Sequence, residues 1–572
     1  MKVTEFLVKS LSRENIDTVF MVPGALIDAF LPEFGNKSPV KAVVASHEAG
    51  AAFMADGYGR AKGSFGVCMV IGGPGTANIV GPLAAAYSDR APVLAIAGEV
   101  ASDIEGRGSF QDASPSGLND IELVRPITSY AAEIPSVKSI KHHLHNALRT
   151  MLSMTTRPVF LSIPAQIQTS EVDDDFTPVS EGLSEPPRII DTKSLQSLAE
   201  TMAKATNIAI LAGDGASRSE ATDALIKLAE TYKIPVATTL RAKGVFPEDH
   251  PLSLGVFGYG GTRHSTEALL GSDLDVLIVL GSSLSQRDTM LWSKRLKPRQ
   301  CMVQVDVDIT AFDRYYPIDM SIVGDVRTVV EWLSAEKGKL PDSLAKTEAE
   351  RHKWFSEILA LERIYNLDTR IDESSPMHPA RVISEMRKVA PRNTVAVIDS
   401  GAHRAFAAEH WTSYAPGQYL SSTTVAPMGW AIPAAIGAKV ARPDMPCAVI
   451  TGDGCMGMHG IEIQTAAHQG LHIIYLVINN SALGNVYLRA KETESGANLT
   501  SLTTHDWAGF SRSLGGDGIT VEKPEDLASA FEKAFAADGP FVIDARCGRD
   551  FTTPIGPWNE AKKENRDWLV DH

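Results

Sequence analysis

Short, continuously apolar segments rich in β-branched residues recur along the chain, each followed by a turn and a stretch with helical spacing. Central strands of parallel sheets have this character because helices cover both of their faces. The pattern therefore predicts an α/β protein built on doubly wound parallel sheets. The clearest strand candidates are residues 40–45, 66–71, 92–97, 207–212, 274–280, 394–399, 447–451 and 472–478.

Two segments interrupt this rhythm and divide the chain. Residues 172–188 are acidic, proline-rich and without periodicity, which predicts a linker. Residues 339–377 begin in a polar, proline-containing stretch and continue as a charged helix, which predicts a second linker. We therefore expect three α/β domains of ordinary size and a polar tail that lies over another part of the molecule. The expected domains are residues 1–171, 189–338 and 378–548, and the tail is 549–572.

Composition narrows the class of protein. The hydrophobic fraction is 44% and the charged fraction 22%, which are ordinary globular values. Lysine and arginine number 54 against 69 aspartates and glutamates, so the net charge is −15. An acidic chain lacks the basic surface of nucleic-acid binders and polybasic membrane proteins, so we expect neither kind of partner. Any anionic ligand must be held by a local group of residues.

Cysteine usage and the absence of long apolar runs indicate the compartment. The five cysteines show no CxxC spacing, which is typical of free thiols in a reducing compartment. The first residues have amphipathic helical spacing and no uninterrupted apolar stretch, so they do not resemble a signal peptide. No apolar run reaches the ~18–20 residues needed to span a bilayer. We expect a cytoplasmic protein.

Two strand ends in the third domain carry the strongest signal of chemistry. Strand 447–451 leads into Gly452-Asp453-Gly454, and strand 472–478 leads into Asn479-Asn480. In parallel sheets the carboxyl ends of strands form the edge that binds ligands. A carboxylate, an amide oxygen and one backbone carbonyl beyond Asn480 suit Mg²⁺ that also holds phosphate oxygens, and glycines let backbone N–H groups approach an anion. The pattern predicts a Mg–diphosphate site; the alternative is two unrelated turns.

With this pair of motifs the chain resembles the thiamine diphosphate (ThDP) enzymes of the pyruvate decarboxylase and acetolactate synthase superfamily. The order of the motifs and the residues in them are most similar to those of acetolactate synthase. The resemblance implies the ThDP fold, with a pyrimidine-binding first domain, a central domain and a diphosphate-binding third domain, and implies ThDP and Mg²⁺ as cofactors. The other matching segments are 19–25, 46–61, 72–78, 106–112, 242–258, 428–438 and 482–486.

The resemblance assigns a role to three residues around the cofactor rings. Glu48 would hydrogen-bond to the aminopyrimidine so that its amine can take the proton of the reactive carbon, whose later chemistry belongs to the cofactor. The alternative is an ordinary carboxylate at a helix N-terminus. Met428 matches the apolar residue that bends the cofactor, with core packing as the alternative. The Ala426 carbonyl would accept a hydrogen bond from the pyrimidine amine.

The remaining contacts also follow from the resemblance. Phe110 and Gln111 match a pair that lines the acetolactate synthase site, so with Glu48 they are the expected catalytic residues. Ala482 would give its carbonyl to Mg²⁺ beside Asp453 and Asn480. The other cofactor-binding residues that the resemblance implies are Pro23, Gly24, Gly73, Asn78, Gly401, His403, Gly452, Gly454, Cys455, Leu483 and Gly484.

The chain departs from acetolactate synthase at positions that concern the acceptor substrate. The arginine before the family's His-Glu pair is Ser46, and the glutamine after it is Ala49. The family's SGGLGTMG block reads STTVAPMG at 422–429. The tryptophan that ranks acceptors in the family corresponds to Arg489, which suits an acceptor with a carboxylate or another anionic group. A solvent-facing helix arginine is the alternative.

The sequence of the middle domain does not decide whether FAD binds there. Its Gly213-Asp214-Gly215 turn, Arg218 and Arg287 correspond to residues that cradle FAD in family members that carry it. A short glycine motif is weak by itself, and Ser283 replaces one of the family's two arginines. FAD binding and a purely structural middle domain therefore both remain open.

The implied function is decarboxylation of a 2-oxo acid, pyruvate or a close homologue, with transfer of the acyl-anion unit to a carbonyl acceptor. The alternatives are a non-ligating 2-oxo acid decarboxylase or C–C hydrolase, an FAD-dependent oxidase of the same fold, and a ThDP-binding regulatory protein without turnover. The retained Glu48 argues against the last, because binding alone does not require it. Since Glu48 and Asp453 lie in different domains, the resemblance implies a homodimer or homotetramer with the active site at the subunit interface.

Overall fold

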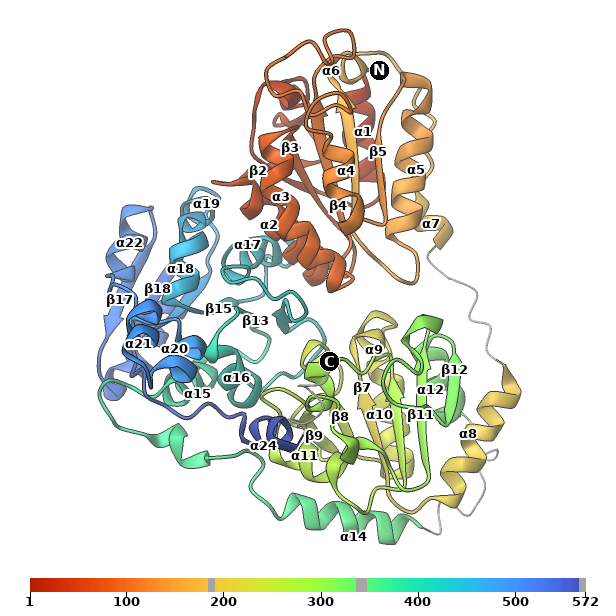
Figure 1. Cartoon of the computed structure of the whole chain (residues 1–572), viewed down its shortest axis with the longest axis vertical. Helices are drawn as coiled ribbons and strands as arrows, with labels where there is room; N and C mark the ends of the chain where they lie inside the picture. Colours follow the sequence, from red (N-terminus) through yellow and green to blue (C-terminus); the bar gives the residue numbers. More distant parts are fainter. Residues whose placement is uncertain (184–190, 336–346, 565–572) are drawn as a thin grey trace.

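The computed structural model describes residues 1–183, 191–335 and 347–564, and it contains three parallel six-stranded sheets flanked by helices (Figure 1). The predicted fold class is confirmed, whereas the domain boundaries stay predictions. Residues 184–188 and 339–346 of the two predicted linkers lie outside the described residues, as does the end of the predicted tail. No helix within the described ranges is long and apolar enough to cross a membrane.

The first and third sheets share one strand order. The first sheet runs β2-β1-β3-β4-β6-β5 and the third runs β14-β13-β15-β16-β18-β17, so corresponding strands occupy corresponding places. The first sheet consists of β1 (Thr18–Met21), β2 (Lys41–Val44), β3 (Gly66–Ile71), β4 (Val93–Glu99), β5 (Tyr130–Glu133) and β6 (Val159–Pro164). The third consists of β13 (Val395–Ile398), β14 (Tyr419–Ser421), β15 (Cys447–Gly452), β16 (Ile474–Asn479), β17 (Asp517–Val521) and β18 (Phe541–Arg546).

The middle sheet is wound differently. Its order, β12-β11-β10-β7-β8-β9, is that of a dinucleotide-binding fold, with the reversal of strand order between β7 and β10. Its strands are β7 (Ile208–Ala212), β8 (Val236–Thr238), β9 (Ser253–Val256), β10 (Val276–Leu280), β11 (Cys301–Asp306) and β12 (Met320–Val323). All eight strand candidates from the sequence lie in these three sheets.

Helices connect and cover the strands. Those of the first part are α1 (Val3–Arg13), α2 (Glu48–Lys62), α3 (Pro74–Ser88), α4 (Asp120–Val124), α5 (Ile140–Met151), α6 (Ala165–Gln168) and α7 (Val179–Leu183). The middle part contains α8 (Thr192–Lys204), α9 (Asp214–Arg218), α10 (Thr222–Tyr232), α11 (Arg263–Leu270) and α12 (Val326–Ala335), followed by α14 (Glu348–Leu359). The third part contains α15 (Pro379–Val389), α16 (Ala402–His410), α17 (Ala431–Ala441), α18 (Asp453–His459), α19 (Ile463–His468), α20 (Gly484–Ala490), α21 (Glu494–Thr500), α22 (Trp507–Ser513), α23 (Leu527–Phe535) and α24 (Gly556–Glu564).

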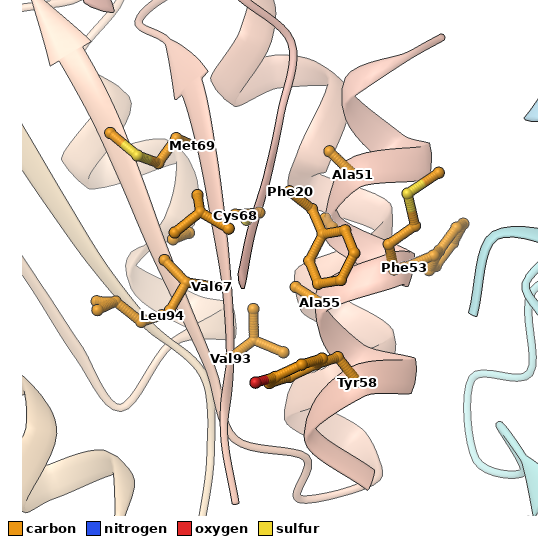
Figure 2. Close-up of a cluster of buried hydrophobic side chains, with 14 of the residues drawn as sticks. Phe20, Ala51, Phe53, Ala55, Tyr58, Val67, Cys68, Met69, Val93 and Leu94 are labelled. Atoms are coloured by element: carbon orange, nitrogen blue, oxygen red, sulfur yellow. The ribbon is translucent and has the colours of Figure 1, made fainter. Parts of the chain in front are cut away.

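Helix α2 is buried on two sides. Figure 2 shows Ala55 and Tyr58 pointing from α2 toward Val67 of β3, while Phe53 projects from the opposite side of the helix. The Phe53 ring lies 5.4 Å from the ring of His459 in α18. Because one face of α2 packs on its own sheet and the other on the third domain, α2 belongs to the core of both.

The contact between α2 and α17 is made by backbone. A Cβ at Gly57 would lie 2.0 Å from the carbonyl oxygen of Ala434, and one at Gly437 would lie 1.9 Å from that of Met54. Since real Cβ atoms cannot approach so closely, both positions require glycine. In Figure 1 the two helices lie side by side between the first and third domains.

Asp89 links all three domains through its buried carboxylate and its backbone carbonyl. Asp89, at the end of α3, accepts hydrogen bonds from Thr423 N (3.2 Å) and Thr424 N (3.0 Å) of the third domain and from Arg60 (3.1 Å). Arg241 of the middle domain donates to the Asp89 carbonyl oxygen at 2.6 Å. Burial alone would raise the pKa of Asp89, but the charges of Arg60 and Arg241 outweigh it and hold the pKa at about 2.

We predict that Gly437→Ala loosens the α2–α17 contact. The added methyl group must displace the Met54 carbonyl, and overpacking of this kind costs about 1–3 kcal/mol of unfolding free energy. Urea unfolding followed by circular dichroism measures the loss. Gly81→Ala in α3 is the matched control because its Cβ would meet nothing within 4 Å, so its helix propensity should leave stability equal or higher. Equal stability of the two variants would contradict the backbone contact.

Candidate functional site

A cavity of about 290 Å³ lies at the carboxyl ends of β13, β15 and β16. The strand order reverses beside β13, and open α/β sheets bind ligands at such a switch point. The structure brings together all the site residues that the sequence predicts in the third domain. They are Gly401, His403, Ala426, Met428, Gly452, Asp453, Gly454, Cys455, Asn480, Ala482, Leu483 and Gly484.

Asp453 ties the two strand ends together. It is the first residue of α18; its Oδ1 accepts from Gly454 N at 2.8 Å and its Oδ2 from Ala482 N at 3.3 Å. Burial raises the pKa of Asp453 to about 6, although backbone hydrogen bonds oppose that shift. The described residues hold no cluster of three His, Cys, Asp or Glu side chains suited to a metal. A cation here would use Asp453 with the amide oxygen of Asn480 and the carbonyl of Ala482, an oxygen donor set that fits Mg²⁺.

His403 gives the cavity an unsatisfied polar atom. The imidazole is buried, and burial together with the neighbouring Arg404 lowers its pKa to about 3, so the ring is neutral. Its Nε2 has no hydrogen-bond partner. The ring packs on two glycines, because a Cβ at Gly401 or Gly452 would lie 2.4 Å or 3.2 Å from it. A buried unpaired nitrogen needs a partner, and a phosphate oxygen that accepts from Nε2–H would supply one.

The opposite wall is apolar. A Cβ at Gly454 would lie 2.9 Å from Leu483 Cδ2 and 3.0 Å from Met428 Cε, so both side chains converge above this glycine. Met428 is half-buried. Ala426 has a positive φ of 55°, and its carbonyl accepts from Ser400 Oγ at 2.6 Å, which leaves one lone pair of the oxygen for a ligand.

The predicted site residues of the first domain form a separate group. Glu48 is the first residue of α2, is half-buried, and accepts a hydrogen bond from Asn78 Nδ2 at 2.9 Å. Pro23 and Gly24 follow β1, and Gly24 packs against Ile71 at the end of β3. None of these residues lines the cavity in the third domain.

The loop with Phe110 and Gln111 also lies outside the cavity. Phe110 is 84% exposed, and Gln111 has a positive φ of 59°. Gly73, whose φ is 69°, donates its N–H to Asp120 Oδ2 at 3.1 Å. Apart from the buried Gly73, the first domain therefore presents its predicted site residues at its surface, away from the cavity in the same chain.

The cavity contains residues that sequence reasoning assigned elsewhere or missed. Arg287 and Tyr259 of the middle domain line it, and the Arg287 guanidinium lies 4.6 Å from the centre of the Tyr259 ring. Phe551 of the predicted tail lines it too, and Trp558 of α24 packs on Tyr259 with ring centres 5.5 Å apart. The lack of a strand pattern after residue 548 predicts a tail that lies over another part of the molecule. On the sequence alone, Arg287 is only a candidate FAD-binding residue.

At the glycine turn of the middle domain (residues 213–215), the side chain of Asp214 forms ion pairs with two arginines. The Asp214 carboxylate pairs with Arg218 and Arg241, each at 2.7 Å. Gly213 and Gly215 are needed because a Cβ at either would lie 2.4 Å and 2.7 Å from Gly281 backbone. This turn borders a cavity of about 540 Å³ between the domains. The carboxylate of Asp214 already pairs with both arginines, which does not favour the anionic diphosphate of FAD at this turn.

Arg489 does not reach the cavity. It lies in the last turn of α20, is exposed, and is absent from the cavity lining. Within one chain Arg489 is therefore a solvent-facing helix arginine, which was the alternative to a role in binding the acceptor.

Comparison with known proteins shows the family of the chain. Family models of the thiamine pyrophosphate enzymes match at the N-terminal TPP binding domain (residues 1–118), the central domain (195–333) and the C-terminal TPP binding domain (399–545). An acetolactate synthase of Mycobacterium bovis is 32% identical over 95% of this chain and 88% of its own. A probable acetolactate synthase large subunit of Methanocaldococcus jannaschii is 29% identical over 95% and 91%, and a putative thiamine pyrophosphate-containing protein of Bacillus subtilis is 29% identical over 96% and 92%. The chain therefore belongs to the thiamine pyrophosphate enzymes, in the acetolactate synthase family.

Proposed function

We propose that this protein is a ThDP- and Mg²⁺-dependent carboligase that decarboxylates a 2-oxo acid and transfers the acyl unit to a carbonyl acceptor. The observation that carries the proposal is the third-domain cavity, where the unpaired nitrogen of His403 and the oxygens of Asp453, Asn480 and Ala482 fit a Mg–diphosphate. ThDP would supply the carbon nucleophile that attacks the 2-oxo acid and the electron sink that lets CO₂ leave.

The chain's own residues divide the remaining work. Asp453, Asn480 and Ala482 hold the cation, while His403 donates to the diphosphate. Met428 and Leu483 form the apolar support above Gly454. Glu48 holds the proton that the pyrimidine ring must exchange to activate the cofactor. No step of this proposal uses FAD.

The site requires two chains in this proposal. Glu48 lies outside the cavity of its own chain, so the Glu48 that serves a cavity comes from a second copy. Apolar side chains stand exposed in the loop of the first domain, in the cavity lining and on α18 and α21 of the third domain. Phe110 is 84% exposed, Val425 51%, Met458 53% and Leu499 82%. Exposed apolar residues around a site are typical of a surface that another protein covers. We propose a homodimer or a larger homo-oligomer on this basis.

Arg287 is the proposed anchor for the carboxylate of a 2-oxo acid. The other arginine that lines the cavity, Arg404, donates to the Asp399 carbonyl and to Ser400 Oγ. Arg287 is half-buried on the face of Tyr259, which orients its guanidinium. Such a group recognises a carboxylate with two parallel hydrogen bonds.

All five cysteines are free in the structure, which supports the proposed cytoplasmic location.

The proposal of a shared site predicts complementation between two inactive variants. Glu48→Ala and Asp453→Ala should each lack carboligase activity, tested with pyruvate. After subunit exchange in equal amounts, half of the dimers are mixed, and each mixed dimer has one site with neither defect. Activity should therefore return to about a quarter of the wild-type value by the symmetry of the dimer. No recovery, with mixed dimers detected by native mass spectrometry, would contradict the shared site.

The cation assignment predicts that Asp453→Ala loses Mg²⁺-dependent ThDP binding. Removing the carboxylate leaves the protein with only neutral oxygens to bind the Mg–diphosphate, and these hold Mg²⁺ poorly. Isothermal titration with ThDP in the presence and absence of Mg²⁺ measures the effect. Asp526→Ala, an exposed aspartate of the same domain, is the control and should bind as the wild type does. Equal ThDP affinity in the two variants would refute the assignment.

The two arginines near the site make opposite predictions. Arg287→Lys should raise KM for the 2-oxo acid by about 10- to 100-fold, the value of a hydrogen bond to a charged group, because lysine cannot form the bidentate contact. Arg489→Lys should leave KM and acceptor preference unchanged, since its side chain is exposed outside the cavity. Steady-state kinetics with competing acceptors distinguishes them. A changed preference in Arg489→Lys alone would reverse the roles of the two arginines.

A further inference from the structure

Two buried carboxylates cross the boundary between the first and third domains in opposite directions. Asp89 of the first domain accepts the backbone N–H groups of Thr423 and Thr424 in the third. Glu462 of the third domain accepts those of Ser46 (3.0 Å) and His47 (3.1 Å) in the first. In both cases one side chain takes two consecutive N–H groups of the other domain, so each carboxylate fixes a short piece of backbone across the boundary.

Glu462 is fully buried and well satisfied. It ends the short 3-10 helix η9 (Gly460–Glu462), and Thr465 Oγ1 donates to its Oε2 at 2.8 Å. A buried carboxylate is costly without hydrogen bonds, and three donors converge on this one. Gly50 of α2 makes room for it, because a Cβ there would lie 1.9 Å from Glu462 Oε1. The carboxylate therefore occupies the space beside the first turn of α2.

The backbone that Glu462 holds is the one that carries Glu48. Ser46 and His47 immediately precede Glu48, the first residue of α2. The His47 ring accepts from Ala49 N at 3.1 Å, and Asn78 contacts the Glu48 carboxylate from α3. With Glu462 on the backbone side and Asn78 on the side-chain side, Glu48 is oriented from two directions.

We propose that Glu462 is a positioning residue for Glu48: it fixes the start of α2 so that the Glu48 carboxyl can exchange a proton with the cofactor. The inference rests on the proposed role of Glu48. Without the carboxylate, the Ser46 and His47 N–H groups lose their acceptor and the helix start shifts. A displacement of about 1 Å in a catalytic group can cost ~10²-fold in rate, whereas the binding of the Mg–diphosphate in the third-domain cavity is spared.

Deuterium exchange of the C2 proton of ThDP tests this inference in the Mg²⁺-loaded holoprotein. The variants are Glu462→Gln, which keeps shape but offers one acceptor oxygen, and Gly50→Ala, which displaces an unaltered carboxylate. Both should slow exchange by about 10- to 100-fold and change ThDP affinity, measured by calorimetry, by less than about threefold, an order-of-magnitude expectation for a residue outside the binding cavity. Glu48→Gln is measured beside them, as is the double variant with Glu462→Gln.

The double variant separates positioning from general support of the fold. If Glu462 acts through Glu48, Glu48→Gln/Glu462→Gln exchanges no more slowly than Glu48→Gln, because residues acting as a unit are not additive. Asp275→Asn is the matched control: this buried aspartate of the middle domain accepts Thr206 N and Asn207 N, both at 3.0 Å, with no contact to α2. It should lower the thermal unfolding midpoint and leave C2 exchange at the wild-type rate.

Three results would overturn the inference. Wild-type exchange in Glu462→Gln and Gly50→Ala while Glu48→Gln is slow would remove Glu462 from this role and leave that of Glu48 intact. Additive losses in the double variant would show that Glu462 acts by another route. Wild-type exchange in Glu48→Gln itself would refute the proposed role of Glu48, and the positioning role of Glu462 with it. Should Glu462→Gln fail to fold, Gly50→Ala gives the same comparison.

Discussion

The backbone contact between α2 and α17 sets the relation of the first domain to the third. Gly57 and Gly437 place each helix against the carbonyl groups of the other, with no room for a Cβ. Side chains can adjust to a neighbour by changing rotamer, but two backbones in contact cannot, so this crossing allows little variation in angle or distance. The position of Glu48 at the start of α2 depends on it, as does the packing of Phe53 on His459.

Buried carboxylates also fix distant segments of the chain relative to one another. Asp89, Asp453 and Glu462 each accept backbone N–H groups from a segment distant in the sequence. Backbone donors are suited to this because they cannot rotate away, and hydrogen bonds to an ionised acceptor are stronger than neutral ones. The same chemistry thus joins the strand ends around the cation site and holds the domains together.

The middle domain contributes differently from the other two. It has the dinucleotide-binding strand order, yet Asp214 pairs with the arginines at its glycine turn, and Arg241 reaches from there to Asp89. Its contribution to the cavity is Arg287, supported by Tyr259 and, behind that ring, by Trp558 of α24. In Figure 1, α24 lies on the middle domain, so the end of the chain connects that domain with the third.

The sequence by itself determined the fold class and put the Asp453 and Asn480 strand ends at one edge of a sheet, while the resemblance supplied the other third-domain residues. Continuous apolar runs specify central parallel strands because burial on both faces leaves no polar side. The ends of parallel strands lie at one edge of the sheet, which puts Asp453 and Asn480 at the same edge; that β15 and β16 are neighbours came from the structure. The half-exposed strand β12 was not named from the sequence, nor were buried strands such as β6 and β18.

Only the tertiary structure decided which distant segments touch. Spacing along a chain contains no information on the angle between domains. The sequence therefore could not show that Glu48 lies outside the cavity, that Glu462 binds the backbone before α2, or that Arg287 lines the cavity. The unpaired Nε2 of His403 and the ion pairs of Asp214 depend on the same three-dimensional packing. Local periodicity determines elements, whereas the partners of buried polar groups are determined by how those elements pack.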